Sequence, residues 1–337
     1  MKILKNKVAL LVAMMLLVMG LAGCGEKAED SNGANSGVNS LSPEITNADS
    51  EHSDLEDASG EAGNVADTIY PFDFTDSYGN VVTIEACPER IVSVAPNMTE
   101  MLFELGVGDK VVGRTDYCDY PAEVANIQSV GAIDKPDLEQ IISLEPDVVI
   151  ATTFTEEGIA KLDAAGIPVI VLHEEGTVDG VYVMIEDMGN IINKNQEAAN
   201  MVAEMKATIA DVQAKTKELE KPSVYYVVGY GEYGDYTAGG DTFVGGMLEL
   251  AGGDNIAKDI SGWNISLEKL IESDPDIIII SQWMNDDFVN APNYSELSAV
   301  KNGKVYTMDV NMLERQGYRN AQGVLELAKI FHPGVFE

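Results

Sequence analysis

Aromatic side chains that could hold a flat ligand gather in one part of the sequence. Five tyrosines fall within twelve residues, at Tyr225, Tyr226, Tyr230, Tyr233 and Tyr236. The first two alternate along a strand pattern, so we expect at least one of them in the core. The last three follow on a glycine-rich loop, where rings can stack on flat, partly apolar molecules while the hydroxyl hydrogen-bonds. Two tryptophans, Trp263 and Trp283, stand at segment ends and fit either a core or a ligand-binding role.

The same loop contains a glycine pattern that also occurs in dinucleotide sites. Residues 229–234 read GYGEYG, which matches the GxGxxG spacing after a strand. A dinucleotide site needs a helix that starts within the motif and directs its amide groups at phosphate. Here the chain continues through DYTAGG before any helical pattern begins. We therefore expect no dinucleotide binding.

Catalytic and metal-ligating patterns find little support. The chain has three histidines, His52, His173 and His332, with neither an HExxH nor a Cys-x-x-Cys pattern. His173 and the two glutamates after it could ligate a metal, but a solvated loop cluster is the simpler interpretation. No GxSxG motif and no Cys and His nucleophile pair occurs. We expect no catalysis and no metal or cofactor of the protein's own, so any metal arrives inside the ligand.

The amino terminus predicts export and a lipid anchor. Three lysines precede an apolar run that ends in LAGC, with small residues directly before Cys24. This pattern is typical of a lipoprotein signal over residues 1–23, which is cleaved so that Cys24 carries acyl chains. Residues 24–67 are acidic and poor in apolar side chains, which predicts a disordered tether. About forty such residues would place the folded part about 35 Å from the lipid.

Charge and cysteine content narrow the partners and the compartment. The formal net charge is −35 at pH 7, which disfavours binding to nucleic acid or to anionic lipid. With Cys24 acylated, only Cys87 and Cys118 could pair. The sequence leaves open whether these two thiols are free or form a disulfide.

The folded part alternates strand and helix patterns, which is typical of parallel α/β sheets. Two lobes are expected, at residues 68–192 and 222–337, and the first begins with a strand pair and turn over residues 72–84. Strands are expected at residues 91–95, 111–115, 148–152, 169–172, 223–228, 277–281 and 304–308. Helices are expected to begin near Asn97, Asp137, Glu156, Val178, Asp241, Ser266 and Asn320.

One long helix is predicted between the lobes, over residues 193–221. Apolar side chains recur there at three-and-four spacing, at Ala198, Met201, Val202, Met205, Ile209 and Val212, and Pro222 follows. A helix over residues 193–220 would span about 42 Å at 1.5 Å per residue. We therefore expect a stiff connector, and a cleft between the lobes that closes only slightly.

Both lobes repeat one short pattern. Leu-Glu, followed by Pro-Asp before a strand, occurs at Glu139 and again at Glu268 with identical spacing. A capping residue, Asp137 or Ser266, puts each glutamate in the first turn of a surface helix. An acid in a first turn also favours the helix dipole, which explains either glutamate taken singly. Its recurrence favours two matched carboxylates that pair with basic residues on a two-fold symmetric partner.

Several segments resemble one class of transport proteins. PERIVSVAPNMTEMLFELG, VGRTDYCDYP, LEQIISLEPDVVIAT, AGIPVIVL and AGGDNIA resemble, in order and spacing, the ABC binding proteins for cobalamin, ferric siderophores or haem. The resemblance covers residues 70–335, and the stretch from Tyr117 to Pro121 is most similar to the cobalamin branch. It implies an α/β fold of two Rossmann-like lobes with central, mainly parallel sheets, joined by a single long interlobe helix. It also implies an ABC permease dimer with its ATPase subunits as partner, docked by Glu139 and Glu268.

The resemblance further implies ligand contacts between the lobes. Tyr117 and Tyr236 match aromatic cleft positions of the cobalamin branch, and Trp263 lies about one residue from another. A tryptophan expected in a first-lobe loop is replaced here, near Ile133. Arg319 stands where siderophore- and haem-binding relatives place a basic residue that meets ligand carboxylates or hydroxamates.

These inferences favour a monomeric substrate-binding lipoprotein on the outside of the cell membrane, in a cell of Gram-positive type. We expect it to hold a corrinoid, a ferric siderophore or haem at the carboxyl ends of the sheet strands and to deliver it to a permease. Two alternatives stay open. One is a surface-anchored α/β lipoprotein enzyme, and the other is a solute receptor that signals to a sensor and never feeds a permease.

Overall fold

The protein is described by a computed structural model that covers residues 65–173 and 176–336. All of these residues belong to one compact unit. The predicted signal sequence, Cys24 and the predicted tether up to residue 64 lie outside the described residues. The predicted lobe boundaries stay predictions, while the elements below define the fold of the described residues.

The first lobe is built on a five-stranded parallel sheet in the order β5-β4-β3-β6-β7. Its strands are β3 (Ile91–Ser93), β4 (Val111–Arg114), β5 (Gln128–Ser129), β6 (Val148–Ala151) and β7 (Val169–Val171). Its helices are α2 (Pro96–Glu104), α3 (Leu138–Ser143), α4 (Glu156–Ala164) and α5 (Val178–Ile191), with short 3-10 turns at Gly108–Lys110 and Ala122–Asn126. An antiparallel hairpin, β1 (Phe72–Thr75) and β2 (Val81–Ile84), precedes the sheet. The central strands β3 and β6 are buried along their whole length, as β-branched runs covered on both faces must be.

The second lobe is built on a four-stranded parallel sheet in the order β10-β8-β12-β13. Its strands are β8 (Ser223–Val227), β10 (Asp254–Asn255), β12 (Ile277–Ser281) and β13 (Val305–Met308). A separate antiparallel pair joins β9 (Asp235–Tyr236) to β11 (Asn264–Ile265). The helices are α7 (Phe243–Leu250), α8 (Leu267–Ser273), α9 (Asn285–Val289), α10 (Ser298–Lys301), α11 (Asn311–Glu314) and α12 (Arg319–Phe331).

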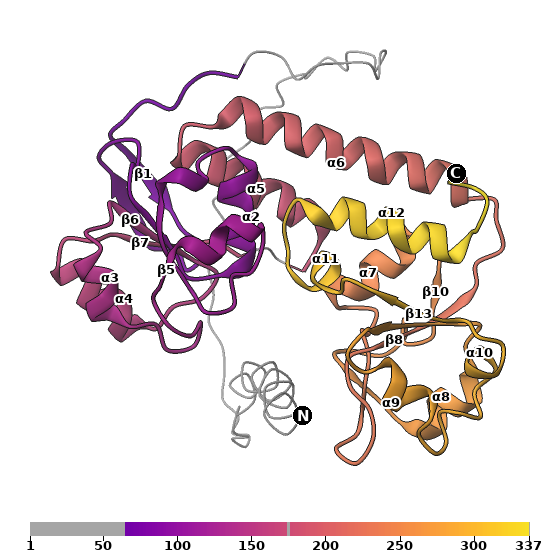
Figure 1. Ribbon diagram of the computed structural model, residues 1–337. Helices are drawn as coiled ribbons and strands as arrows, with labels where there is room; N and C mark the ends of the chain where they lie inside the picture. The colour runs from indigo at the N-terminus through magenta and orange to yellow at the C-terminus, as the bar shows by residue number, and fades with distance from the viewer. Residues whose placement is uncertain (1–64, 174–175, 337) are drawn as a thin grey trace, which may run out of the picture. The chain divides into compact units, whose positions relative to one another are not determined.

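Helix α6 (Asn195–Thr216) joins the lobes and packs against helices of both, α5 from the first and α12 and α7 from the second (Figure 1). Its 22 residues span about 33 Å, which is shorter than predicted. At its start Asn193 takes a left-handed φ of 53°, which separates α6 from α5. At its end Thr216 is the last buried side chain, and the five predicted residues that follow, 217–221, are all exposed and have no core to pack against. The predicted fold of two parallel α/β lobes on one long helix is confirmed.

One apolar cluster runs through α6 into both lobes. Val202 and Ile209 of α6 belong to the same cluster as Ile185 of α5, Met98 of α2 and Leu327 of α12. Two smaller clusters lie on the other faces of the two sheets, one in each lobe. The lobes therefore share core with the connecting helix, and moving either one would expose apolar surface.

The predicted tether ends earlier than expected. Asn195 donates from Nδ2 to the carbonyl of Ala66 (2.9 Å), and the Gln196 side chain accepts from the Val65 amide (2.9 Å). Residues 65–67 are therefore held against the first turn of α6. These residues were predicted as tether from their amino-acid composition. Composition carries no information about hydrogen bonds to side chains 129 or more residues away.

Helices α5 and α6 approach closely at Gly189. A Cβ atom on Gly189 would lie 2.5 Å from Cβ of Ala198 on α6 and 3.1 Å from the Lys194 carbonyl oxygen. In α7, by contrast, a Cβ atom on Gly246 would meet no atom within 4 Å.

Gly189→Ala is therefore expected to lower the free energy of unfolding by about 2 kcal/mol, since overpacking must push α5 off α6. Gly246→Ala is the matched control and should raise the free energy of unfolding by up to about 1 kcal/mol, the helix-propensity gain. Urea unfolding of both variants measures the difference. Effects of the same sign would contradict this close approach.

Candidate ligand cleft and docking helices

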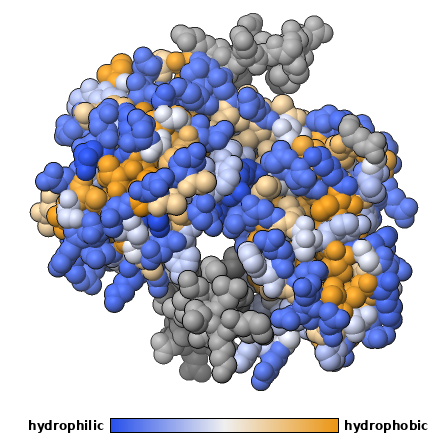
Figure 2. All heavy atoms as spheres, in the orientation of Figure 1, coloured by the Kyte–Doolittle hydropathy of each residue, from blue (hydrophilic) through white to orange (hydrophobic). Residues whose placement is uncertain are grey.

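Both sheets reverse their strand order once, and ligands of open parallel sheets bind at such a point, outside the carboxyl ends of the strands. In the first lobe the reversal lies between β3 and β6, and in the second between β8 and β12. The surface is hollowed between the two lobes on the face seen in Figure 2. The loops that leave β3, β6, β8 and β12 are thus the ones positioned to line a ligand cleft.

Two of the predicted ligand contacts lie together in the second lobe. Tyr236 in β9 pairs with Asn264 in β11, and the Thr237 amide donates to the carbonyl of Trp263 (2.8 Å). The Tyr236 hydroxyl donates to the carbonyl of Tyr233 (3.0 Å). Both aromatic rings are half-buried, and Trp263 packs against the main apolar cluster. The β9–β11 pair therefore presents a partly exposed aromatic surface after β8.

The remaining tyrosines of this region divide into core and surface. Tyr225 and Tyr226 are both fully buried, which confirms a core role for the strand tyrosines. The ring of Tyr230 lies with its centroid 5.0 Å from that of Phe288 and 5.2 Å from that of Tyr294, in a small aromatic cluster of the second lobe. The GYGEYG loop leads into β9, and no helix begins until Phe243 in α7, as expected.

Two aromatic side chains are strongly exposed where β8 and β12 end. Tyr233 in the loop after β8 is 87% exposed, and Trp283, two residues after β12, is 72% exposed. Strands β8 and β12 are neighbours in the sheet, so both loops start at the same edge. Trp283 is therefore a surface residue and not part of the core.

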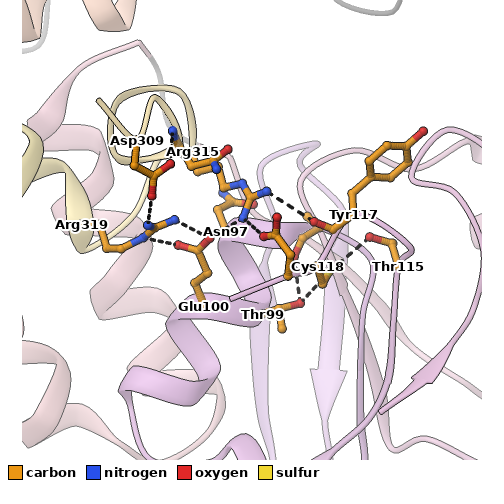
Figure 3. Close-up of polar contacts among 12 residues, drawn as sticks. Asn97, Thr99, Glu100, Thr115, Tyr117, Cys118, Asp309, Arg315 and Arg319 are labelled. Atoms are coloured by element: carbon orange, nitrogen blue, oxygen red, sulfur yellow. Dashed lines mark hydrogen bonds and ion pairs between the residues drawn. The ribbon is translucent and has the colours of Figure 1, made fainter. Parts of the chain in front are cut away.

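The other two predicted contacts, Tyr117 and Arg319, are linked through a network of charged side chains between α2 and the segment around α11 and α12 (Figure 3). Arg319 donates from Nε and Nη2 to the two carboxylate oxygens of Glu100, each at 2.8 Å. Its Nη1 donates to Asp309 (3.0 Å). Because Arg319 and Glu100 are both buried, this bidentate pair ties the second lobe directly to the first.

Arg315 adds a second bridge to the same carboxylate. Its Nη1 lies 2.7 Å from Glu100 Oε1 and 2.7 Å from Asp119 Oδ1. Its Nη2 donates to the carbonyl of Tyr117 (3.4 Å), while the Tyr117 ring points away from the network (Figure 3). Asn97 of α2 also donates to the Gln316 carbonyl (3.0 Å). We call Glu100, Asp119, Asp309, Arg315 and Arg319 the interlobe ion cluster.

The electrostatics of this cluster favour the charged forms. Burial alone would lower the pKa of Arg315, but hydrogen bonds to Asp119 and Glu100 outweigh it and raise the pKa. For Arg319 burial also acts to lower the pKa, and the bonds to Glu100 and the charge of Asp309 raise it. Both guanidinium groups therefore stay charged and paired across the interface.

The Arg319 side chain already has partners in the structure. Its guanidinium already has three carboxylate contacts, and its planar face lies 4.4 Å from the centroid of the Tyr120 ring. The prediction of a ligand contact stays a prediction, and in the structure this side chain holds the lobes together. Sequence reasoning missed Glu100 and Arg315. The available signal was an acid at a core-facing position of a helix, since Glu100 is buried in α2 among Met98, Met101 and Leu102.

The cysteines left open by the sequence are both free thiols. Cys118 is buried and lies within hydrogen-bonding distance of the hydroxyls of Thr99 (3.1 Å) and Thr115 (3.2 Å). Cys87 is half-buried and donates to the carbonyl of Ile192 (3.4 Å). The described fold is therefore held without a disulfide between them.

The predicted docking glutamates occupy matching places. Asp137 caps α3 by accepting from the Gln140 amide (3.1 Å), and Ser266 caps α8 by accepting from the Lys269 amide (3.1 Å). Glu139 and Glu268 each lie in the first turn of their helix and are exposed. Their placement agrees with the sequence, and their docking role stays a prediction.

A separate cavity of about 830 Å³ lies between α5, α6 and α7. Its lining includes Tyr182, Lys206 and Phe243, with Lys206 Nζ 4.9 Å from the centroid of the Tyr182 ring. None of the four predicted ligand contacts lines it. Among residues 65–173 and 176–336 no group of three or more His, Cys, Asp and Glu side chains could hold a metal ion.

In the same part of the chain, no helix combines the length and the apolar character that crossing a membrane requires.

The chain belongs to the periplasmic binding protein family, whose profile matches residues 91–312. The family consists of binding proteins, which confirms the predicted binding role in place of an enzymatic one. One relative is an uncharacterized ABC transporter substrate-binding lipoprotein of Bacillus subtilis, YvrC. It is 31% identical over 343 residues, which cover 99% of this chain and all of that protein.

Two further relatives carry named ligands. A cobalamin-binding protein of Halobacterium salinarum is 29% identical over 280 residues, covering 78% of this chain and 74% of its own. Among solved structures, the periplasmic heme-binding protein RhuT from Roseiflexus sp. RS-1, in apo form, superposes with a TM-score of 0.67. It is 25% identical, and the match covers 73% of this chain and 99% of that one.

The interlobe ion cluster makes a stability prediction. Glu100→Gln removes the charge that both arginines share and leaves them buried without their common partner, so the free energy of unfolding should fall by about 3 kcal/mol. Urea unfolding measures this change.

The control is Glu89→Gln, because Glu89 pairs with Lys110 (3.0 Å) at the surface. That change should cost less than about 1 kcal/mol. Equal effects of the two variants would show that the cluster does not stabilise the lobes.

Proposed function

We propose that this chain is the substrate-binding lipoprotein of an ABC importer, and that it captures a metal chelate and delivers it to the permease. The observation that carries the proposal is the pairing of a cleft with two equivalent outward-facing glutamates, one on each lobe. Both lobes are packed on one helix, so Glu139 and Glu268 keep a fixed separation. A partner with two basic groups at the same separation could bind both glutamates. The relationship to an ABC transporter substrate-binding lipoprotein over 99% of the chain supports this proposal.

The proposed ligand is a corrinoid, haem or a ferric siderophore, bound at the ends of the sheet strands. Support comes from relatives named for cobalamin and for heme and from the aromatic surface of Tyr236 and Trp263. Flat macrocycles suit such a surface, because stacking buries apolar area without fixing many polar contacts. We propose no resident cofactor, since the metal would arrive within the ligand.

Tyr117 and Arg319 would contribute from the other end of the cleft. Tyr117 is half-buried and projects its ring away from the interlobe ion cluster, so we propose that the exposed part of the ring meets the ligand. Arg319 could meet a ligand carboxylate only by exchanging a partner. Asp309 is the candidate for exchange, since its side chain is 44% exposed whereas Glu100 is buried.

The anchoring and assembly of the protein are part of the proposal. We propose that Cys24 carries the lipid, that the protein works as a monomer outside a Gram-positive type of membrane, and that its partner is a permease dimer with ATPase subunits. The lipoprotein relative and the LAGC sequence support the anchor. A pair of equivalent docking helices suits a two-fold symmetric partner.

A fluorescence titration tests the ligand class. The chain contains two tryptophans, Trp263 in the β9–β11 region and exposed Trp283. Cyanocobalamin, haemin or a ferric hydroxamate should quench the tryptophan emission of the chain from residue 25 onward. Trp263→Phe should reduce the quenching and weaken binding by about tenfold, since one stacking partner is lost. If none of the three compounds quenches the emission, the proposed ligand class is wrong.

A transport assay tests the docking role. Glu139→Lys combined with Glu268→Lys should abolish cellular uptake of the compound identified by titration, because each carboxylate is replaced by a charge that repels a basic partner. Affinity for the compound should stay unchanged, since both helices lie outside the predicted ligand contacts. The control is Glu186→Lys on α5, a charge reversal away from the repeat. Full uptake by the double variant would remove the docking assignment.

A further inference from the structure

Each docking glutamate has an exposed isoleucine one helical turn later. Ile142 follows Glu139 on α3 and is 39% exposed, and Ile271 follows Glu268 on α8 and is 49% exposed. Residues three apart on a helix lie on the same face. Both lobes therefore present a carboxylate and an apolar side chain next to each other.

The two helices match in sequence position, because every residue of α3 has its counterpart in α8 129 residues later. Ile141 and Leu270 are the fully buried anchors of α3 and α8. Each helix is followed by a residue of positive φ, Glu145 (47°) and Asp274 (37°). The strands β6 and β12 then begin at matching positions. The repeat in sequence is thus also a repeat in backbone conformation and burial.

In each copy an aspartate after the helix accepts hydrogen bonds from the start of a neighbouring sheet strand. Asp147 accepts from the amides of Glu89 and Arg90, both at 2.8 Å, just before β3. Asp276 accepts from the amide (2.9 Å) and the hydroxyl (2.8 Å) of Ser223 at the start of β8. The segment that joins each helix to its next strand is therefore fixed to the sheet in the same way in both lobes.

The outer faces of the two helices agree in chemistry at two positions only. The glutamate and the isoleucine are the same in both copies, whereas Gln140 corresponds to Lys269 and Ser143 to Glu272. Ile141 and Leu270 are the fully buried anchors of the helices, whereas Ile142 and Ile271 leave 39% and 49% of their surface exposed. A large apolar side chain at an exposed position, repeated beside a functional charge, is typical of a protein contact.

We propose that each lobe docks on the importer's permease dimer through a two-part contact, with the glutamate pairing a basic side chain and the isoleucine entering an apolar spot beside it. This inference rests on the proposed function. The partner presents the same combination at two places related by its two-fold axis. This chain has a net charge of −35, so ion pairing speeds its association with a basic partner, and salt weakens that effect. The isoleucines add apolar contacts with the partner, which salt does not screen.

The test uses the full-length chain and the ABC permease–ATPase complex that restores uptake together with it, purified in the same detergent. Ile142→Ala combined with Ile271→Ala should weaken binding at least tenfold at both low and high salt, because about half of each side chain is available for burial. Ile142→Met with Ile271→Met keeps an apolar surface and should bind within about threefold of wild type. Val183→Ala on α5, another exposed apolar residue, is the matched control and should bind like wild type.

The outcomes separate the inference from the proposed function. If the alanine pair binds like the Val183→Ala control while Glu139→Lys with Glu268→Lys loses binding, the isoleucine contact is refuted and the docking assignment stands. If the isoleucine effect vanishes at high salt along with the glutamate effect, the apolar contact is also refuted. If the wild-type chain binds no such complex, both the inference and the proposed function fail. Ligand affinity measured on each variant shows that its fold is intact.

Discussion

The structure depends on one constraint, which is that both lobes pack on the same helix. The buried face of α6 carries Ala198, Val202, Met205, Ile209 and Val212, and these side chains lie against α5 from the first lobe and α12 and α7 from the second. Since the three helices share one continuous apolar cluster, neither lobe can swing away without exposing core to water. The connection is therefore a packed element and not a hinge. A cleft built this way is formed before the ligand arrives.

The interlobe ion cluster reinforces that constraint with a different force. Glu100 of the first lobe is shared by Arg315 and Arg319 of the second, and the exposed ends of the cluster are carboxylates, Asp119 and Asp309. The buried centre orients the lobes, because a bidentate pair tolerates little change of angle. The exposed carboxylates lie near the backbone of Tyr117, whose ring projects away from the cluster. The same residues thus connect the rigidity of the fold to the place where a charged ligand group would meet the protein.

Much of the fold was predictable because its elements are dictated locally. The run of isoleucines at Ile277–Ser281 predicted β12 with its observed bounds, and the caps Asp137 and Ser266 predicted the exposed first turns of α3 and α8. The two-residue strands β5, β9, β10 and β11 were not predicted, because so short a pairing is set by its neighbour and not by its own sequence. The end of α6 was overestimated, because the exposed residues after Thr216 have good helix propensity but no core to cover. The pairing across the lobes in the ion cluster could not be predicted, since those partners lie 196 to 219 residues apart along the chain.

The distance between the two lobes, measured with and without ligand, tests the central claim most directly. Nitroxide labels on Ser143→Cys of α3 and Glu272→Cys of α8, in a chain from residue 25 onward with Cys87 and Cys118 replaced by serine, report that distance by pulsed electron paramagnetic resonance. Packing of both lobes on α6 predicts one narrow distance distribution that shifts by less than about 2 Å when the ligand binds. A broad distribution in the free protein, or a shift of about 10 Å or more, as expected for hinge closure, would contradict the rigid connector.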